Sequence, residues 1–511
     1  MTRLIASMKD KIKFVPILLL IFMTFWLRLV NLGYSDYYGD EIKAMWLPER
    51  NQSAIEFLYD QKKGPIEFLV TYLVKFRDPD YSNEFLLRLP FTLAGILGIF
   101  FFYRLVELHF GKKIALYATL LLSINGIFVG LMRIAQYQSF VILFSILTLY
   151  AFSLALLQER WKYTGIYTGV ICWTAALLTH YDGIFIAPFA LYLLYRWCRA
   201  NNDLPLQRRI MHIAIPFVLS ALVIGIYFVP YMLSISSSTK IYWAERIAGE
   251  GIPDIERSSS FLNFQIYNPV LGVYVYLALG VLSLPKVKRT LPVILWFALP
   301  WIVLEGIIFD PGTHIYTYLL PATILVAFGL ETLERILEKI LVNVLGIIWG
   351  KRLNLAWLAL LFGSLAFISH WIFVDHTPEY PFEQKRIIFW TLGGPYGDYK
   401  TWLYGFPYYR GWEAIGEYVT SSEGKWYYYT NEHTSISDFY VHYGHSVVNA
   451  GQYVYILHPQ SFIGSDGVKE KASYWQTHYP PVKIFEIDGK VVAEVYEMPP
   501  GELDEIQEAG Y

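Results

Sequence analysis

Residues 14–41 read FVPILLLIFMTFWLRLVNLGYSDYYGDE and contain the two features that decide the fold class. The first is the apolar run 14–32, which is long enough for a helix that crosses a bilayer, since a span needs about 20 residues. It is too long for the apolar part of a signal peptide, and no small-residue cleavage site precedes Gly33. The second is the acidic turn that follows at once. The segment therefore predicts an uncleaved first span that ends in a polar loop.

The composition of the whole chain agrees with a membrane protein. Of its 511 residues, 55% are hydrophobic and only 16% are charged, whereas soluble domains have about 25% charged residues. The net charge of −2 gives no indication of nucleic-acid binding. The two cysteines, Cys172 and Cys198, exclude a disulfide framework and a cysteine-built zinc site. We therefore expect a mostly α-helical polytopic membrane protein.

Ten further apolar runs follow the first span, which predicts about eleven transmembrane helices. The expected spans are 14–32, 85–105, 114–131, 138–157, 164–180, 184–197, 212–233, 269–284, 291–309, 315–333 and 354–374. The stretch 334–350 has several charges before its apolar part, which indicates an amphipathic or re-entrant segment.

The orientation follows from lysine and arginine in the short loops, because these residues favour the cytoplasmic side. The basic residues fall at the N-terminus and in alternate loops: Arg3, Lys9, Lys11, Lys13, Arg104, Lys112, Lys113, Arg160, Lys162, Arg196, Arg199, Arg208, Arg209, Lys286, Lys288, Arg289, Lys351 and Arg352. The N-terminus is therefore expected in the cytoplasm. With an odd number of spans, the C-terminal end is exported.

This topology predicts two domains. Residues 1–374 form a transmembrane domain, in which 33–84 are an exported first loop with interfacial helices. Residues 375–511 are polar and rich in turns, and they contain short strand-like runs, for example 426–430 and 491–496. They read as an exported α/β domain with a helix over 412–419.

Asp40 and Glu41 in the first exported loop are the clearest candidates for chemistry. They are adjacent carboxylates close to the membrane interface, with apolar or aromatic neighbours on both sides. Burial and mutual repulsion raise the pKa of a carboxylate, which suits a general base. The alternative is a solvated turn in which Asp40 only caps a helix.

Two cations on the same side could bind an anion. The turn Gln61-Lys62-Lys63-Gly64-Pro65 precedes an amphipathic helix, and an ammonium group at a helix start favours phosphate. Arg133 lies at the exported end of the third span, where statistics disfavour a positive charge. The alternative for both is a side chain that reaches to the interface. We expect Asp40, Lys63 and Arg133 to line one cavity.

Further polar residues occupy the same exported ends. His180, Tyr181 and Asp182 follow the fifth span, and His314 and Tyr318 begin the tenth. Histidine and aspartate are metal-ligand types, but two scattered histidines do not indicate a site, and a hydrogen-bonded interior histidine is the alternative. No metal ligand and no cofactor is assigned, although a divalent metal is compatible with these residues.

The chain resembles a known family in these segments. Arg28-Leu-Val-Asn-Leu32 followed by Asp40-Glu41 looks like the first-span and Asp-Glu loop signature of the family 39 and related GT-C glycosyltransferases. That group includes the dolichyl-phosphate-mannose protein mannosyltransferases and the lipid A aminoarabinose transferases. Lys63-Gly64-Pro65 is similar to their Lys-Pro-Pro or His-Pro-Pro element, and 88–98 resembles their second span. In two departures from the pattern, Gly64 replaces the first proline, and Gln138 stands where many members have an acid.

The resemblance implies a GT-C fold and a glycosyltransferase that takes a sugar from a polyprenyl-phosphate donor, usually with inversion. Asp40 would be the base or acceptor-binding acid, supported by Glu41, and Lys63 would contact the donor phosphate with help from Arg133. The remaining candidates for the substrate cleft are Gln138, His180, Tyr181, Asp182, His314 and Tyr318.

The expected partners are the lipid-linked donor, an acceptor protein, lipid or glycan, and membrane lipids, without nucleic acid. The expected location is a bacterial or archaeal plasma membrane, with the site on the exported face. A polymerase or ligase for diphosphate-linked glycans is an alternative enzyme, but such enzymes lack this early Asp-Glu loop. A transporter or flippase for lipid-linked sugars, or a membrane scaffold, is the alternative outside the enzymes.

Overall fold

The structure is a computed structural model, and it describes most of the chain. The described residues are 15–61, 63–249, 264–269, 273–387, 390–392, 403–421, 427–442, 444–446, 450–459 and 466–499. The basic N-terminal residues Arg3, Lys9, Lys11 and Lys13, as well as Lys62, lie outside them.

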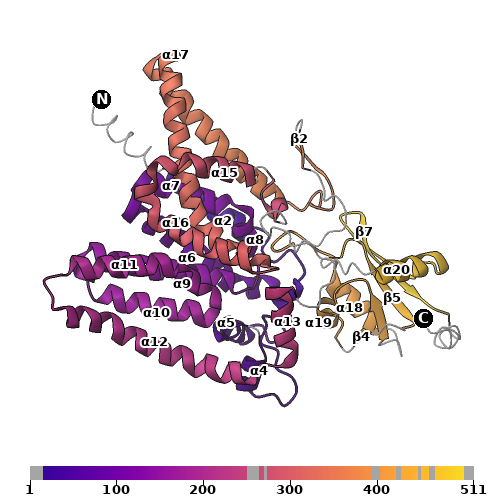
Figure 1. Ribbon diagram of the computed structural model, residues 1–511. Helices are drawn as coiled ribbons and strands as arrows, with labels where there is room; N and C mark the ends of the chain where they lie inside the picture. The colour runs from indigo at the N-terminus through magenta and orange to yellow at the C-terminus, as the bar shows by residue number, and fades with distance from the viewer. Residues whose placement is uncertain are drawn as a thin grey trace.

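A bundle of helices makes up the first three quarters of the chain (Figure 1). Its helices are α2 (Val15–Leu29), α3 (Gly39–Ile42), α4 (Ala54–Asp60), α5 (Pro65–Lys75), α6 (Glu84–Phe110), α7 (Lys112–Ile124), α8 (Gly126–Leu131), α9 (Gln138–Leu157), α10 (Thr164–Thr179), α11 (Ala187–Ala200), α12 (Leu206–Ser234), α13 (Ser237–Ala248), α15 (Val273–Leu282), α16 (Val287–Trp301) and α17 (Tyr316–Phe373).

Each of the eleven expected spans coincides with helix in the described residues. Among the residues that the structure describes, five helical segments could cross a membrane by length and composition: Glu84–Phe110, Gln138–Leu157, Leu206–Ser234, Leu284–Ile307 and Gly312–Phe373. Val15–Leu29 and Thr164–Thr179 are shorter apolar helices. The chain thus has the apolar helices of an integral membrane protein, while the number of eleven crossings stays a prediction.

Helix α17 contains two of the expected spans. Gly346 interrupts its helical backbone with a φ of 79°, a left-handed conformation that glycine adopts without steric cost. The chain turns back there, so that α17 forms a long hairpin that rises above the other helices (Figure 1). The stretch 334–350 therefore forms the end of the first arm of this hairpin and its turn, and its assignment as an amphipathic or re-entrant segment stays a prediction.

The expected span 114–131 is broken into α7 and α8 at Asn125. The Asn125 carboxamide oxygen accepts a hydrogen bond from the backbone N–H of Ile127 and so caps α8. Its NH₂ group donates to the hydroxyl of Tyr276 at 2.8 Å. The Asn125 side chain thus competes with the helix for backbone hydrogen bonds, which explains a break between α7 and α8 that hydropathy alone does not predict.

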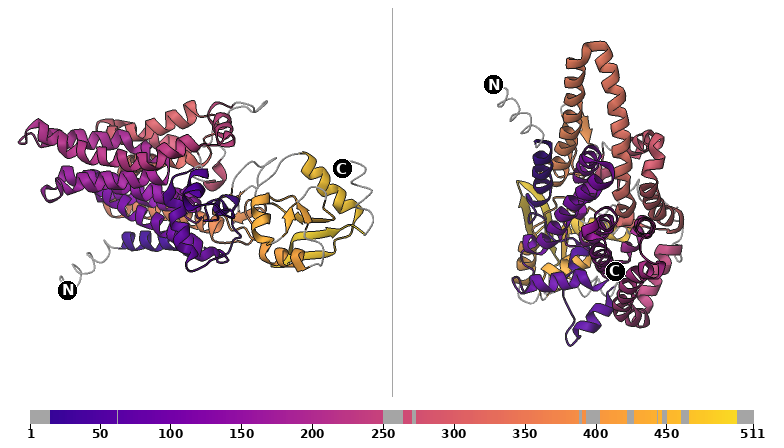
Figure 2. Two further views of the ribbon diagram at one scale, coloured as in Figure 1. Left: turned by 90° about the horizontal axis from the view of Figure 1, so that it is seen from below. Right: turned by 90° about the vertical axis from the view of Figure 1, so that its left-hand side faces the viewer.

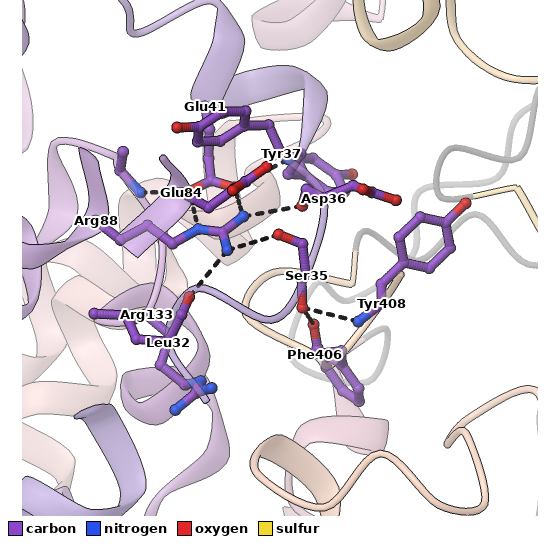
Figure 3. A network of polar contacts seen from close by, with 12 residues as sticks. Leu32, Ser35, Asp36, Tyr37, Glu41, Glu84, Arg88, Arg133, Phe406 and Tyr408 are labelled. Atoms are coloured by element: carbon purple, nitrogen blue, oxygen red, sulfur yellow. Dashed lines mark hydrogen bonds and ion pairs between the residues drawn. The ribbon is translucent and has the colours of Figure 1, made fainter. Parts of the chain in front are cut away.

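The first loop is fastened to the bundle by one buried arginine (Figure 3). The Arg88 guanidinium on α6 donates to both carboxylate oxygens of Glu41, each at 2.8 Å. It also donates to the backbone carbonyls of Leu32, Ser35 and Asp36. Removal of one partner of a buried ion pair typically costs about 3–5 kcal/mol. This network therefore fixes the turn that carries Asp40.

The C-terminal part forms a five-stranded mixed sheet in the order β4-β3-β5-β7-β6, with helices on both faces. Its elements are α18 (Trp412–Ser421), β3 (Tyr427–Thr430), α19 (Thr434–Tyr440), β4 (His445–Ser446), β5 (Gln452–Ile456), α20 (Asp466–His478), β6 (Lys483–Ile487) and β7 (Lys490–Glu497), preceded by the hairpin β1 (Lys385–Ile387) and β2 (Trp390–Leu392). Alternate residues of β5 face opposite ways: Val454 packs with Trp412 of α18, and Tyr453 stacks on Trp475 of α20.

The sheet-bearing part sits at one end of the bundle (Figure 2). Its hydrophobic core is continuous with that of the first loop, because one buried cluster combines residues of both. The loop contributes Tyr37, Ile42, Met45, Trp46, Phe57 and Phe68, and the sheet-bearing part contributes Trp412, Ile415, Val419, Tyr428, Ile436, Val441, Val454, Ile456, Ala493 and Val495. The expected boundary near residue 375 therefore separates two regions that share a core.

Candidate active site

A cavity of about 540 Å³ opens where the helix ends, the first loop and the C-terminal part meet. Residues from seven separate segments line it, including Asp40, Lys63, Gln136, Tyr137, His180, Tyr181, Arg246, His314 and Tyr404. The opposite ends of α9 and α10 adjoin Arg160 and Lys162. Since α9 has 20 residues at about 1.5 Å rise each, roughly 30 Å separates the cavity from those basic residues.

Asp40 projects into the cavity from the short helix α3. One carboxylate oxygen accepts a hydrogen bond from the hydroxyl of Tyr404 at 2.8 Å, and the other lies 3.5 Å from the Lys43 ammonium. Burial alone would raise the pKa of Asp40, but Lys63, Lys43 and the Tyr404 hydrogen bond lower it below its ordinary value. Asp40 is therefore a carboxylate at neutral pH.

Tyr404 reaches Asp40 because its backbone lies directly on α8. A Cβ at Gly130 would stand 2.3 Å from the Tyr404 carbonyl oxygen, so only glycine permits this approach. The backbone N–H of Tyr404 also donates to the Tyr267 hydroxyl at 2.6 Å. Tyr404, which donates a hydrogen bond to Asp40, thus comes from the segment after α17.

Lys63 lies on the cavity wall at the start of α5. Its ammonium is 3.1 Å from the carboxylate of Glu67, one turn further along the helix, and lies 5.1 Å from the centre of the Tyr137 ring. Glu67 is fully buried. Burial raises the pKa of Glu67, although Lys63 opposes this shift. One buried carboxylate therefore orients the lysine, whose side chain remains 19% exposed.

Arg246 of α13 is a second cation of the cavity. Its guanidinium donates to the Asp310 carbonyl at 2.8 Å and to the Tyr242 hydroxyl. Burial alone would lower the pKa of Arg246, but Tyr242 and Asp310 raise it above its ordinary value. Three cations therefore line the cavity, and Lys63 and Arg246, which are less exposed than Lys43, can hold a phosphate as a pair.

His180 and His314 complete the wall opposite the acid. The Tyr137 ring stacks on His180 with 4.0 Å between ring centres and 10° between planes. His314 lies 2.7 Å from Asp182, measured from Nδ1 to Oδ2. Although 132 residues separate His314 from Asp182, the ends of α10 and the start of α17 bring them into contact.

The structure corrects the assignment of Arg133. Its guanidinium donates to the carbonyls of Leu27, Val30 and Asn31 and so satisfies the C-terminal end of α2. It is not among the residues that line the cavity. Its charge at the exported end of a span is therefore explained by the backbone carbonyls at the end of a neighbouring helix.

Glu41 is likewise turned away from the cavity. It is fully buried, pairs with Arg88, and accepts hydrogen bonds from the backbone N–H groups of Ala135 and Tyr38. Both carboxylate oxygens of Glu41 therefore accept hydrogen bonds from Arg88 and from a backbone N–H. Glu41 therefore supports the loop that carries Asp40, and it does not reach a substrate in that cavity.

Three other cleft candidates lie behind the wall. The Gln138 carboxamide donates to the side chain of Gln136, which does line the cavity. The Tyr318 hydroxyl donates to Glu305 at 2.8 Å. Asp182 faces a small inner cavity of about 10 Å³. Of the six cleft candidates, His180, Tyr181 and His314 line the main cavity.

Sequence analysis missed Arg246, Tyr404, Glu67 and Gln136. The sequence does contain a signal for Arg246. Like Arg133, it is a positive charge in a loop expected on the exported side, where such charges are disfavoured. Tyr404 carries no comparable signal, since it is one tyrosine of 41 and lies 364 residues from its partner Asp40.

The chain is similar to known proteins in part of its sequence and in its fold. Residues 79–229 match the sequence model of the dolichyl-phosphate-mannose-protein mannosyltransferase family. The structure resembles ArnT from Cupriavidus metallidurans bound to undecaprenyl phosphate, with a TM-score of 0.51 and 14% identity over 95% of this chain and 98% of that one. No curated protein matches the chain by sequence.

A second similar structure is the archaeal oligosaccharyltransferase AglB from Archaeoglobus fulgidus, in complex with an inhibitory peptide and a dolichol-phosphate. The TM-score is 0.51 and the identity is 12%, over 96% of this chain and 75% of that one. Such low identities establish the fold and not the activity. The chain therefore has the GT-C fold, and its resemblance to GT-C glycosyltransferases of the family 39 type is confirmed.

Proposed function

We propose that the protein is an integral-membrane glycosyltransferase that moves a sugar from a polyprenyl-phosphate donor to an acceptor on the exported face. The observation that carries this proposal is that one cavity is lined both by the carboxylate Asp40 and by the cations Lys63 and Arg246. The acid suits an acceptor that loses a proton, and the cations suit a phosphate that gains negative charge.

The reaction is a single displacement. The acceptor hydroxyl or amine attacks the anomeric carbon of the donor sugar, and its proton passes to the Asp40 carboxylate. The bond between the anomeric carbon and the phosphate oxygen breaks, and the polyprenyl phosphate leaves. Because attack occurs opposite the leaving group, one such step inverts the anomeric configuration.

The two cations act on the leaving group. Lys63 is oriented by Glu67, and Arg246 is oriented by Asp310 and Tyr242, so neither needs to reorganise as charge develops on the phosphate. Undecaprenyl phosphate and dolichol-phosphate are bound in the structures of ArnT and AglB. A lipid phosphate of this kind therefore supplies the donor chemistry that we assign to the cavity.

The membrane orientation in this proposal rests on the distribution of charge. The cavity lies at the helix ends away from Arg160 and Lys162, and basic loops favour the cytoplasm. The cavity and the C-terminal part are thereby assigned to the exported face of a bacterial or archaeal plasma membrane. A scaffold that only binds partners does not account for a cavity shared by Asp40 and Lys63.

Substitution of the base tests the proposal. Asp40→Asn keeps the size of the side chain and an acceptor for the Tyr404 hydroxyl, but it removes the proton acceptor. Since general bases contribute about 10²–10⁴-fold, we expect sugar transfer to fall at least about 100-fold while donor binding is retained. The measurement is single-turnover transfer of a radiolabelled sugar from a polyprenyl-phosphate donor in nanodiscs.

The matched control is Glu49→Gln, which neutralises an exposed acid of the same loop that does not line the cavity. We expect this variant to transfer sugar at the wild-type rate. Wild-type turnover by Asp40→Asn would remove the assignment of the base.

A further inference from the structure

His180, Asp182 and His314 form a cluster whose chemistry the sugar-transfer mechanism does not use. One potential ligand atom of each residue lies within 4.8 Å of the other two. All three side chains are more than nine-tenths buried. Their positions are fixed by separate elements, namely the C-terminal end of α10, the 3₁₀ turn Tyr181–Ile186 and the 3₁₀ turn Gly312–Ile315.

The hydrogen bonding within this cluster leaves two acceptors facing each other. His180 Nδ1 lies 3.2 Å from the backbone N–H of Asp182 and accepts a hydrogen bond from it in the tautomer that has no proton on this nitrogen. The same atom lies 3.2 Å from Asp182 Oδ1, a fully buried oxygen that in this tautomer has no hydrogen-bond donor. Two lone pairs at this distance repel each other unless a positive charge lies beside both.

The carboxylate of Asp182 also needs a counter-charge. Within the described part of the chain, its only ion-pair partners are His180 and His314, and its other hydrogen-bond partner is the neutral hydroxyl of Tyr316. A buried carboxylate is stable when it is paired with a cation or coordinates a metal. No lysine or arginine supplies this charge among the ion pairs of the described residues.

We propose that His180, Asp182 and His314 bind a divalent cation of the zinc class. Zinc bonds of about 2.0–2.1 Å in a tetrahedral site place neighbouring ligand atoms about 3.3–3.4 Å apart. The distance of 3.2 Å between His180 Nδ1 and Asp182 Oδ1 is close to this value, and the 2.7 Å between His314 Nδ1 and Asp182 Oδ2 widens on binding. The cation takes the lone pair of His180 that now accepts the Asp182 amide.

The ligand set identifies the class of metal. Two imidazoles and one carboxylate favour zinc or a neighbouring transition metal, whereas Mg²⁺ and Ca²⁺ prefer oxygen ligands. Three protein ligands leave one position of a tetrahedral site open. The two histidines line the main cavity while Asp182 lies behind them, so the open position faces the cavity that contains Lys63.

This placement extends the proposed function. If the cavity holds a lipid phosphate, as proposed above, a cation held by His180, Asp182 and His314 would add to the positive charge that Lys63 and Arg246 supply to the leaving group. The metal site itself does not depend on that assignment, because its ligands are defined without a donor.

Metal binding to the purified full-length chain in nanodiscs is the test. After removal of metal with a chelator and dialysis against ZnCl₂, elemental analysis should find about one equivalent of zinc per chain. Asp182→Asn and His314→Gln should each weaken zinc affinity at least about 100-fold in calorimetry, because each removes one of three ligands. MgCl₂ should not compete. Zinc-free wild type at saturating ZnCl₂, or undiminished affinity in both variants, would overturn the site.

Tyr316→Phe is the matched control. It removes a hydrogen bond to the same oxygen of Asp182 but no proposed ligand, so zinc affinity should fall by about tenfold, less than in Asp182→Asn. A loss as large as that of Asp182→Asn would mean that the cluster responds only to hydrogen-bond disruption and would contradict the ligand assignment. Visible absorption of the Co²⁺-substituted chain provides a check on coordination that does not depend on thermal stability.

The open position is tested with inorganic phosphate. The zinc-loaded chain should bind phosphate at least about tenfold more tightly than the zinc-free chain, with the excess lost in His314→Gln. Equal phosphate affinity with and without zinc would contradict the open position while leaving the metal ligands intact. Because neither measurement uses a sugar donor, the failure of this site and the failure of the proposed function remain distinguishable.

Discussion

At the scale of single residues, the state of Asp40 is set by its neighbours. Lys43 lies 3.5 Å from one of its oxygens and, with Lys63, lowers the pKa of Asp40. A base with a lowered pKa stays ionised until the pH falls through that lowered value. The acid limb of the pH–rate profile should therefore lie below the ordinary range of an aspartate.

Lys43→Met makes this prediction measurable. Removal of the positive charge raises the pKa of Asp40, so the rate should begin to fall at a higher pH than in the wild type. The shift should shrink in high salt, because Lys43 is largely exposed and its field is screened. Initial rates between pH 3 and pH 7 at two ionic strengths check the direction. A shift to lower pH would contradict the assignment of that limb to Asp40.

Residues also show why only part of the site follows from the sequence. Asp40 and Lys63 were found because local motifs identify them, and the cavity contains both. Arg133 lies outside this cavity, contrary to expectation, because its partners are carbonyls at and just beyond the end of α2, about a hundred residues away. Arg246 and Tyr404 enter the site through the packing of distant segments, a kind of contact that periodicity and spacing in one sequence do not encode.

At the scale of elements, the contact between α5 and α10 positions Lys63. A Cβ at Gly64 would stand 2.0 Å from the carbonyl oxygen of Leu178 on α10. The glycine that departs from the proline of the family pattern therefore permits a close approach of two backbones. The helices themselves are predictable from the sequence because hydropathy is a local property. The close approach of Gly64 to Leu178 is not, because it joins segments that are far apart in the sequence.

Gly64→Ala should push the start of α5 away from α10. Overpacking of this kind costs about 1–3 kcal/mol, and it moves Lys63 relative to the histidines of the opposite wall. We expect a lower melting temperature together with weaker binding of polyprenyl phosphate. Gly363→Ala is the control, since a Cβ there meets no atom within 4 Å. Unchanged donor affinity in Gly64→Ala would show that this contact does not position the lysine.

At the scale of the whole molecule, the first loop and the C-terminal part behave as one folding unit. Their apolar residues share a buried cluster that includes Trp46 and Trp412, and α19 packs beside α3, which carries Asp40. The composition of residues 375–511 predicts a separate domain, because composition does not show which surfaces a domain hides against its neighbours.

Expression of residues 375–511 alone should therefore yield a chain without cooperative unfolding. Separation from the first loop exposes the apolar face that Tyr37, Ile42 and Trp46 cover in the full chain. Thermal denaturation followed by near-ultraviolet circular dichroism measures this. Co-expression with residues 1–374 should restore a cooperative transition. A sharp transition of the isolated fragment would contradict the shared core.

The hydrogen bond from Tyr404 to Asp40 has a consequence for biosynthesis. During synthesis, Asp40 emerges from the ribosome early, with the first loop. Its partner Tyr404 emerges only after α17, the final helix of the bundle. A nascent chain therefore holds an incomplete site throughout insertion of the helices. If Asp40 is the base, as proposed, export of the segment after α17 is the event that completes the site, and half-made chains do not consume the lipid-linked sugar donor.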